Sequence, residues 1–375
     1  MASGEERIFS CDVGSLPPTV DIERLNRGAK DVLRPGRASS SAALQFKRTV
    51  LSALRDKLSA GIDVPTYPQF RDMNQMFLSA LSGLELLEGR LVEAGKLRVQ
   101  DPRIPEVLVI REGAHGLADE LGVEKVRLRI CVTGPHTLSF QFAFRSPGLF
   151  ARLGSVLADI VKANVSSARG LEITILAVDE PTFGVVDDPL IEPGSEGREA
   201  LLRAWEEIFS AAKAVGKGIL TCIHLHSTVD GLFWEVGALD VIESHVGDML
   251  YRSHTTARAL EEHDKFLRAS ICRTDYDALV RARLKAEMPG ASETTIAEHL
   301  GAVWRAIGRG EIDPNTFLEP MELMAKRLRA TVERFGLERV ILAGPECGLR
   351  GFPTYWCAIE CLRRVARACG SLSAG

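Results

Sequence analysis

The sequence predicts a single (β/α)₈ barrel of the α/β class. Short β-branched runs alternate with longer amphipathic segments, eight such runs can be counted, and no linker rich in proline, serine and glycine divides the chain. Strands that alternate with helices pair in parallel through right-handed crossovers. Eight such units close into one barrel, and 375 residues are enough to build it.

The predicted strands are short runs rich in valine, isoleucine and leucine. In chain order they cover residues 7–15, 61–67, 126–134, 171–180, 218–226, 239–245, 265–272 and 339–348. Apolar residues at helical spacing predict helices between them, for example over residues 42–60 and 199–216. Residues 84–122 are predicted to form a small β insertion after the second unit, and residues 274–330 a helical insertion before the last strand. We therefore expect one domain over residues 1–375, with two insertions.

Composition and charge exclude several classes of function. The formal charge is −4, whereas general nucleic-acid binders are basic, so no nucleic-acid partner is expected. No apolar run reaches the roughly 18 residues of a membrane span. The first ten residues lack the apolar segment of a secretory signal, so we expect a cytoplasmic protein whose eight cysteines are reduced thiols.

Metal-binding side chains gather where predicted strands end. The fifth strand ends in His224 and His226, the sixth in Glu243 and His245, and the eighth runs into Cys347. Because side chains alternate along a strand, residues two apart point the same way. The carboxyl ends of the strands build the active site of such a barrel, and imidazole, carboxylate and thiolate are zinc ligands. A lone core histidine is usually structural, but this combination predicts a zinc site if the barrel closes.

Several short motifs give the chain a resemblance to a known family. In order they are "VGSLP", "RDM", "VTGPHT", "DEP", "IHLH" and "GPECGL". The same landmarks occur in this order in the catalytic barrel of cobalamin-independent methionine synthases, and the chain also resembles the short archaeal forms made of that barrel alone. The resemblance implies a zinc-dependent S-methyltransferase that transfers a methyl group to the thiol of homocysteine to make methionine. A metal-bound thiol ionises at neutral pH, whereas a free thiol has a pKa near ~8.5.

The resemblance also implies a set of metal ligands. The family's cysteine after the fifth strand falls on Thr228, a poor zinc ligand, and its acidic ligand falls on Glu243 or His245. His224 is either a substitute ligand or a hydrogen-bonded neighbour that orients a ligand. The predicted ligands are His226, Glu243, His245 and Cys347.

For the amino-acid end of the substrate, the resemblance implies the turn after the first strand and the "DEP" motif. Gly14 and Ser15 supply N–H and hydroxyl donors for a carboxylate, and Asp179 suits an ammonium group. Gln69 stands where the family has an acidic residue. Glu180 either binds the ammonium group together with Asp179 or forms a salt bridge at the rim of the barrel. The predicted substrate-binding residues are Gly14, Ser15, Gln69, Asp179 and Glu180, and the predicted catalytic residues are Asp179 and His226.

The prediction of the methyl donor rests on a residue of the family that this sequence lacks. The family carries a histidine after its seventh strand, and residues 265–275 contain none. A nitrogen leaving group needs acid assistance more than a corrinoid does. We therefore expect a methylated corrinoid, free or protein-bound, or a methylated pterin. The alternatives are a related barrel acting on another thiol, an enzyme like uroporphyrinogen decarboxylase, or a non-catalytic barrel that binds a thiol or a corrinoid.

Overall fold

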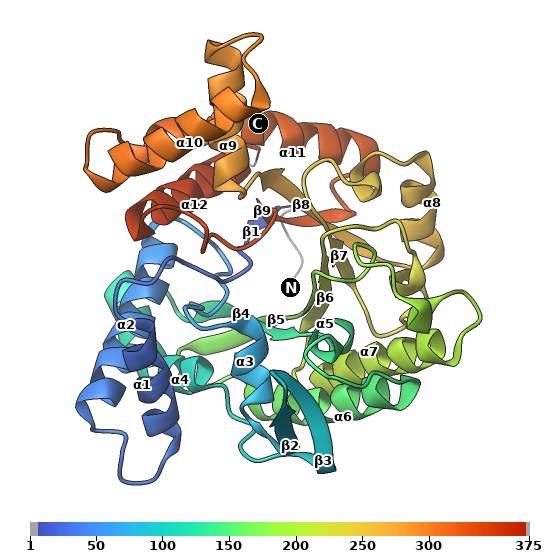
Figure 1. The fold of residues 1–375 in the computed structure, drawn as a ribbon. Coiled ribbons are helices and arrows are strands. Elements are labelled where there is room, and N and C mark those ends of the chain that lie inside the picture. The colour runs from blue at the N-terminus through green and yellow to red at the C-terminus, as the bar shows by residue number, and fades with distance from the viewer. Residues whose placement is uncertain (1–6, 373–375) are drawn as a thin grey trace.

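A curled parallel sheet surrounded by helices forms the centre of the molecule (Figure 1). The computed structural model describes residues 7–372. Seven strands are hydrogen-bonded in the order β1-β9-β8-β7-β6-β5-β4, and every pair is parallel. They are β1 (Phe9–Ser10), β4 (Val126–Thr133), β5 (Leu171–Glu180), β6 (Leu220–Leu225), β7 (Val241–Glu243), β8 (Phe266–Cys272) and β9 (Val340–Pro345). The predicted α/β class and parallel pairing are confirmed.

The predicted strand at residues 61–67 lies between β1 and β4, the two edges of this sheet. Val64 makes a parallel bridge to the residue after β1, and Thr66 makes one to β4. These remain isolated bridges, so the segment is not a regular strand. Pro65 and Pro68 explain this, because proline has no N–H to donate to a ladder. The segment nevertheless brings the two edges together, as in a barrel.

Helices follow the strands and lie outside the sheet (Figure 1). They are α1 (Ile22–Leu33), α2 (Ser41–Ser59), α3 (Met73–Leu78), α4 (Pro105–Leu121), α5 (Pro135–Ser139), α6 (Pro147–Asn164), α7 (Glu196–Val215), α8 (His254–Glu262), α9 (Tyr276–Glu287), α10 (Glu293–Gly308), α11 (Met321–Phe335) and α12 (Tyr355–Gly370). Among the described residues, no helix is both long and apolar enough to cross a membrane.

Residues 84–122 hold two different elements. An antiparallel hairpin is formed by β2 (Leu81–Leu87) and β3 (Arg90–Val99), and α4 follows it. The second half of this stretch was predicted as β structure but is a helix. Pro105 occupies its first turn, and Gly122 ends it in the left-handed conformation with φ 67°. Helix α4 packs against α2 in the outer layer.

Residues 274–330 contain α9, α10 and the start of α11. Helices α9 and α10 pack against each other and project beyond the ring of helices (Figure 1). Helix α11 instead packs against β8 and β9, so it belongs to the barrel's outer layer.

The sheet register places four polar residues in one row. Thr133 on β4 is the partner of Asp179 on β5, which pairs with His224 on β6, which pairs with Glu243 on β7. The row lies at or near the carboxyl end of each strand, where side chains of neighbouring parallel strands come close together. The candidate site is built around this row.

Candidate metal centre

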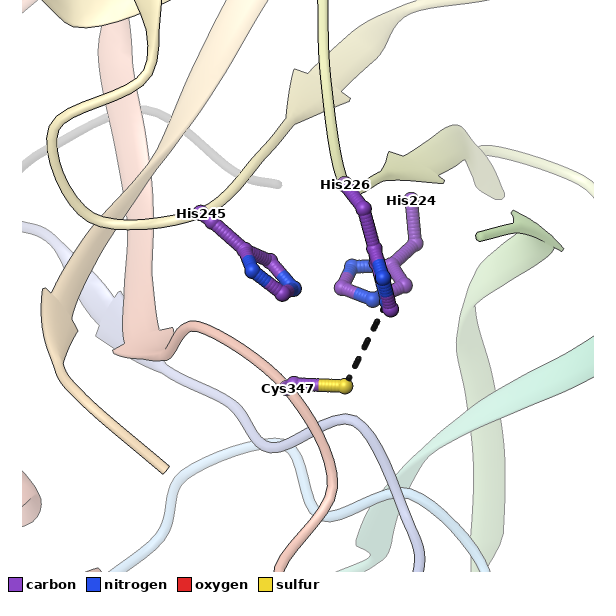
Figure 2. Close-up of side chains that lie close together, drawn as sticks. All are labelled: His224, His226, His245 and Cys347. Carbon is purple, nitrogen blue, oxygen red and sulfur yellow. Dashed lines mark hydrogen bonds between the residues drawn. The ribbon is translucent and has the colours of Figure 1, made fainter. Parts of the chain in front are cut away.

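Three histidines and one cysteine meet at the carboxyl ends of the strands. Each of His224, His226, His245 and Cys347 offers one ligand atom, and these atoms lie within 4.8 Å of one another. The Cys347 Sγ atom is 3.6 Å from His226 Nε2, and the rings of His226 and His245 are 4.0 Å apart between centroids. Figure 2 shows the four side chains pointing toward a common space. The cluster thus unites three of the predicted ligands with His224.

The positions of these residues follow from the ends of three strands. His224 lies within β6, His226 immediately after it, His245 two residues after β7 and Cys347 two residues after β9. The carboxylate of Glu346 accepts hydrogen bonds from the N–H groups of Val246, at 2.9 Å, and Thr274, at 3.0 Å. It thereby joins the loops after β7 and β8 to the segment that carries Cys347.

The electrostatics of the cluster favour a thiolate. Burial by itself would raise the pKa of Cys347, but its three histidine neighbours hold that pKa well below the ordinary value. Burial lowers the pKa of His226, which favours the neutral imidazole that binds metals. Burial would also lower the pKa of His224, yet Cys347 and Glu243 raise it to about 10. A metal ion would therefore have to displace a proton from His224.

The donor set fits a divalent metal with N and S preference. His224 Nε2 and His245 Nε2 are buried and have no hydrogen-bond partner among residues 7–372. Buried ring nitrogens without partners are costly unless something binds them. Three imidazoles and one thiolate are within the range of ligands that zinc accepts in tetrahedral sites. The geometry and chemistry therefore agree with a zinc-type ion at this position.

Glu243 lies outside the cluster, in the barrel interior. Its carboxylate is fully buried and contacts Arg129 Nη2 at 2.5 Å, Arg129 Nη1 at 3.1 Å and Arg268 Nε at 2.9 Å. Burial would raise its pKa, but the two arginines hold the pKa well below the ordinary value. Although predicted as a ligand, Glu243 is placed among cations and not beside Cys347.

Thr228 is not part of the cluster and is hydrogen-bonded to the loop after β7. The Thr228 N–H donates to Asp248 Oδ2 at 3.1 Å, and its hydroxyl also bonds this carboxylate. Thr228 Oγ1 in turn accepts from the N–H of Leu250 at 3.1 Å. These bonds tie the loop after β6 to the loop after β7.

The turn after β1 lies beside the cysteine of the cluster. A Cβ on Gly348 would come 1.9 Å from Ser15 Oγ, so the turn packs directly against the residue that follows Cys347. Gly14 has φ +134°, and a side chain there would meet Thr66 and Gln69 atoms at 3.0 Å. Only glycine fits this backbone without strain. The Gln69 amide nitrogen donates to Cys131 Sγ at 2.6 Å, so it is already engaged within the protein.

Asp179 is the carboxylate of the row that faces the cluster. It is buried, and its Oδ1 atom has no partner among the described residues. Burial raises the pKa of Asp179 to about 6, although the nearby His224 and Arg129 oppose this shift. A buried carboxylate with a free oxygen can receive a donor from a ligand.

Glu180 points the other way and has no free oxygen. Its Oε1 accepts from the His136 N–H and from Trp205 Nε1, both at 2.9 Å, and its Oε2 accepts from the Thr137 N–H at 2.7 Å. The predicted contact with substrate has no place in this arrangement, because the carboxylate ties the first turn of α5 to α7.

Arg129 and Arg268 were not predicted from the sequence as site residues, although both contact the Glu243 carboxylate beside the cluster. A signal was present, since each arginine lies between apolar residues within a predicted strand, "LRI" in what is now β4 and "LRA" in β8. A fully buried arginine inside a strand requires an acidic partner, and Glu243 is the residue that both reach.

The fold and the site together define a class: a parallel α/β barrel with a group of three imidazoles and one thiol, able to hold a metal ion, at the carboxyl ends of its strands. No known family profile matches the sequence. Among curated proteins, a methionine synthase from Sulfolobus acidocaldarius is 27% identical over an alignment of 146 positions that covers 37% of this chain and 42% of that protein. The match thus spans less than half the length of this relative.

Two solved structures share the fold over nearly the whole chain. A B12-independent methionine synthase from Shewanella sp. W3-18-1, in complex with selenomethionine, has a TM-score of 0.59, 15% identity and 98% coverage of both chains. A proposed vitamin-B12-independent methionine synthase from Listeria monocytogenes has a TM-score of 0.58, 13% identity and the same coverage. The comparisons agree with the family resemblance predicted from the ordered motifs, and at these identities the solved structures establish the barrel fold.

Proposed function

We propose that this protein is a zinc-dependent methyltransferase whose methyl acceptor is the thiol of homocysteine. The observation that carries the proposal is the convergence of three imidazoles and a low-pKa cysteine at the mouth of a barrel that resembles methionine synthases. A homocysteine acceptor is supported by the curated relative named a methionine synthase and by the Shewanella structure, which contains selenomethionine.

The residues of the cluster would hold the metal, with His224, His226, His245 and Cys347 as donors. Zinc at this site would supply a Lewis acid that lowers the pKa of the acceptor thiol and so provides a thiolate at neutral pH. The protein's own contribution is to keep Cys347 deprotonated and to hold the four donor side chains on, or just after, strands fixed by the barrel.

The amino-acid part of the acceptor would bind beside the cluster. Asp179 offers an unpaired oxygen to an ammonium group, and Ser15, a partly exposed residue next to Gly348, offers a hydroxyl to a carboxylate. Glu180 and Gln69 support this pocket indirectly, because their polar atoms bond within the protein.

The donor that fits best is a methylated corrinoid, with a methylated pterin as the second choice. The segment between β8 and α9 contains one acidic residue, Asp275, but its carboxylate accepts from the Ala278 N–H at 2.9 Å and caps α9. A corrinoid leaving group needs no proton at this point, whereas a nitrogen leaving group does.

The test is methyl transfer by the purified zinc-loaded protein. It is supplied with homocysteine and either methylcobalamin or a methylated pterin, and methionine is quantified by mass spectrometry. We expect methionine with at least one donor, loss of activity in Cys347→Ala, and retained activity in Cys357→Ala, a buried cysteine outside the cluster. Absence of methionine with every donor, despite stoichiometric zinc, would overturn the proposal and favour a non-catalytic barrel.

A further inference from the structure

The surroundings of Glu243 assign it a task different from metal ligation. We propose that Glu243 is a positioning residue that holds His224 Nδ1 and thereby directs His224 Nε2 toward the metal, while Arg129 and Arg268 lock the carboxylate in place. The inference rests on the proposed metal site and deepens it, because it makes His224 the fourth ligand and names the residues that orient it.

The carboxylate of Glu243 has no oxygen left for a metal. Oε1 lies 2.5 Å from Arg129 Nη2 and 3.0 Å from His224 Nδ1, while Oε2 lies 3.1 Å from Arg129 Nη1 and 2.9 Å from Arg268 Nε. Each oxygen therefore has two positively polarised partners in a fully buried position. Turning either oxygen toward an ion would leave a guanidinium group without its counter-charge, which is strongly unfavourable in a protein interior.

His224 is the only residue of the metal-binding group, within the described chain, that touches this carboxylate. Its Cα is the register partner of the Glu243 Cα across β6 and β7, so the backbone itself fixes their separation. Neither ring nitrogen of His224 makes a well-aligned hydrogen bond among residues 7–372. A metal at Nε2 requires the proton on Nδ1, and that tautomer is the one that donates to Glu243.

The two arginines explain why the carboxylate cannot move. Arg268 Nη2 donates to the carbonyl oxygens of Cys11 and Pro345, both at 2.9 Å, so it is anchored to the residue after β1 and to the end of β9. Arg129 comes from β4 and reaches both oxygens of the carboxylate. The network therefore connects the strand that carries His224 to the strand that leads to Cys347.

A double-mutant cycle on metal affinity tests the proposal without using activity. Cobalt(II) is titrated into the metal-free full-length protein and into Glu243→Gln, His224→Ala and the double variant, with visible absorption as the readout. Outer-sphere partners of a ligating histidine typically contribute about 10- to 100-fold in metal affinity. We expect a loss in that range for Glu243→Gln with the thiolate-to-cobalt absorption retained, and no further loss when Glu243→Gln is added to His224→Ala.

Glu106→Gln is the matched control, because Glu106 is another buried carboxylate held by an arginine, with both Arg71 contacts at 2.8 Å. It should leave cobalt affinity unchanged. The proposal would be overturned if the losses of cobalt affinity caused by Glu243→Gln and His224→Ala multiplied in the double variant. Glu243 would then contribute to metal binding independently of His224. Failure of the unsubstituted protein to bind cobalt would instead refute the metal site and the proposed function.

A second measurement covers the case in which Glu243→Gln does not fold. The zinc-loaded, unsubstituted protein is labelled with ¹⁵N-histidine, and His224 is assigned by its loss in His224→Ala. We expect the His224 signals of a metal-bound Nε2 and a protonated Nδ1. Metal at Nδ1, or an uncoordinated His224, would contradict the proposal.

Discussion

The buried Lys57 amino group offers a sharp test of how the turn after β1 is held. Lys57 Nζ donates to Asp12 Oδ2 at 2.6 Å, to the Thr66 carbonyl at 2.9 Å and to the Gly14 carbonyl at 3.0 Å. Its side chain is fully buried, and burial lowers its pKa although Asp12 opposes the shift. The substitution Lys57→Met keeps the length of the side chain and removes these three contacts.

The expected loss of stability follows from the charge that is left behind. Asp12 retains one hydrogen bond from the Thr66 N–H, at 2.8 Å, but loses its only counter-ion in the described structure. Removing one partner of a buried ion pair costs roughly 3–5 kcal/mol, because the other charge remains buried and unpaired. The Gly14 carbonyl keeps its bond from the Gln69 N–H, so the turn is weakened but still tethered.

The measurement is the free energy of unfolding in urea. Lys47→Met is the control, because Lys47 lies on the same helix but pairs with Glu112 at the surface. Exposed pairs contribute about 0–1 kcal/mol, so the control should lose at most that amount. Adding Asp12→Asn to Lys57→Met should cost less than the sum of the single substitutions, by roughly 0.5–3 kcal/mol. A loss below about 1 kcal/mol for Lys57→Met would refute the reasoning.

Three further predictions concern the rim of the site. Burial raises the pKa of Asp179 to about 6, so its carboxylate is ionised above that pH. The KM for an amino-acid thiol should therefore rise as the pH falls through about 6. The Asp179→Asn variant should have a high KM that does not change with pH in this range. Glu180→Gln should lower the free energy of unfolding by about 1–3 kcal/mol, because it disturbs the hydrogen bonds that the carboxylate accepts. A raised KM together with an unchanged free energy of unfolding would instead indicate direct contact with substrate. Thr228→Cys should leave the thiolate-to-cobalt absorption at the level of one sulfur ligand, because the backbone N–H at position 228 still donates to Asp248 after the hydroxyl is lost. A doubled absorption would show that the loop turns inward.

The order of strands and helices could be predicted because its signal is local. Apolar runs at 171–180 and 265–272 coincide with β5 and β8 to within one residue. The segment at 61–67 was placed correctly but pairs only through isolated bridges, since its prolines weaken a ladder. The apolar residues of α4 were assigned to β structure, although Pro105 and Gly122 mark the two ends of a helix.

The site was less predictable, because its contacts cross the barrel. Strand alternation places Glu243 and His245 on the same side, but β7 ends at Glu243, so His245 reaches the cluster from a loop while Glu243 faces the interior. The partners that retain Glu243 there come from β4 and β8, far away in sequence. The orientation of Glu180 could have been predicted from strand alternation, because the residue next to an inward-facing Asp179 must face outward.

Under the proposed function, the donor set and the absence of a histidine from residues 265–275 would favour the same methyl donor. Three neutral imidazoles and one thiolate leave more positive charge on a divalent ion than a set with a second cysteine and a carboxylate. A more positive centre lowers the pKa of the bound acceptor thiol further, and the nucleophilicity of sulfur falls as its pKa falls. In the proposed reaction, a weaker nucleophile would be better matched to a donor whose leaving group departs without a proton, which supports the choice of a methylated corrinoid over a methylated pterin.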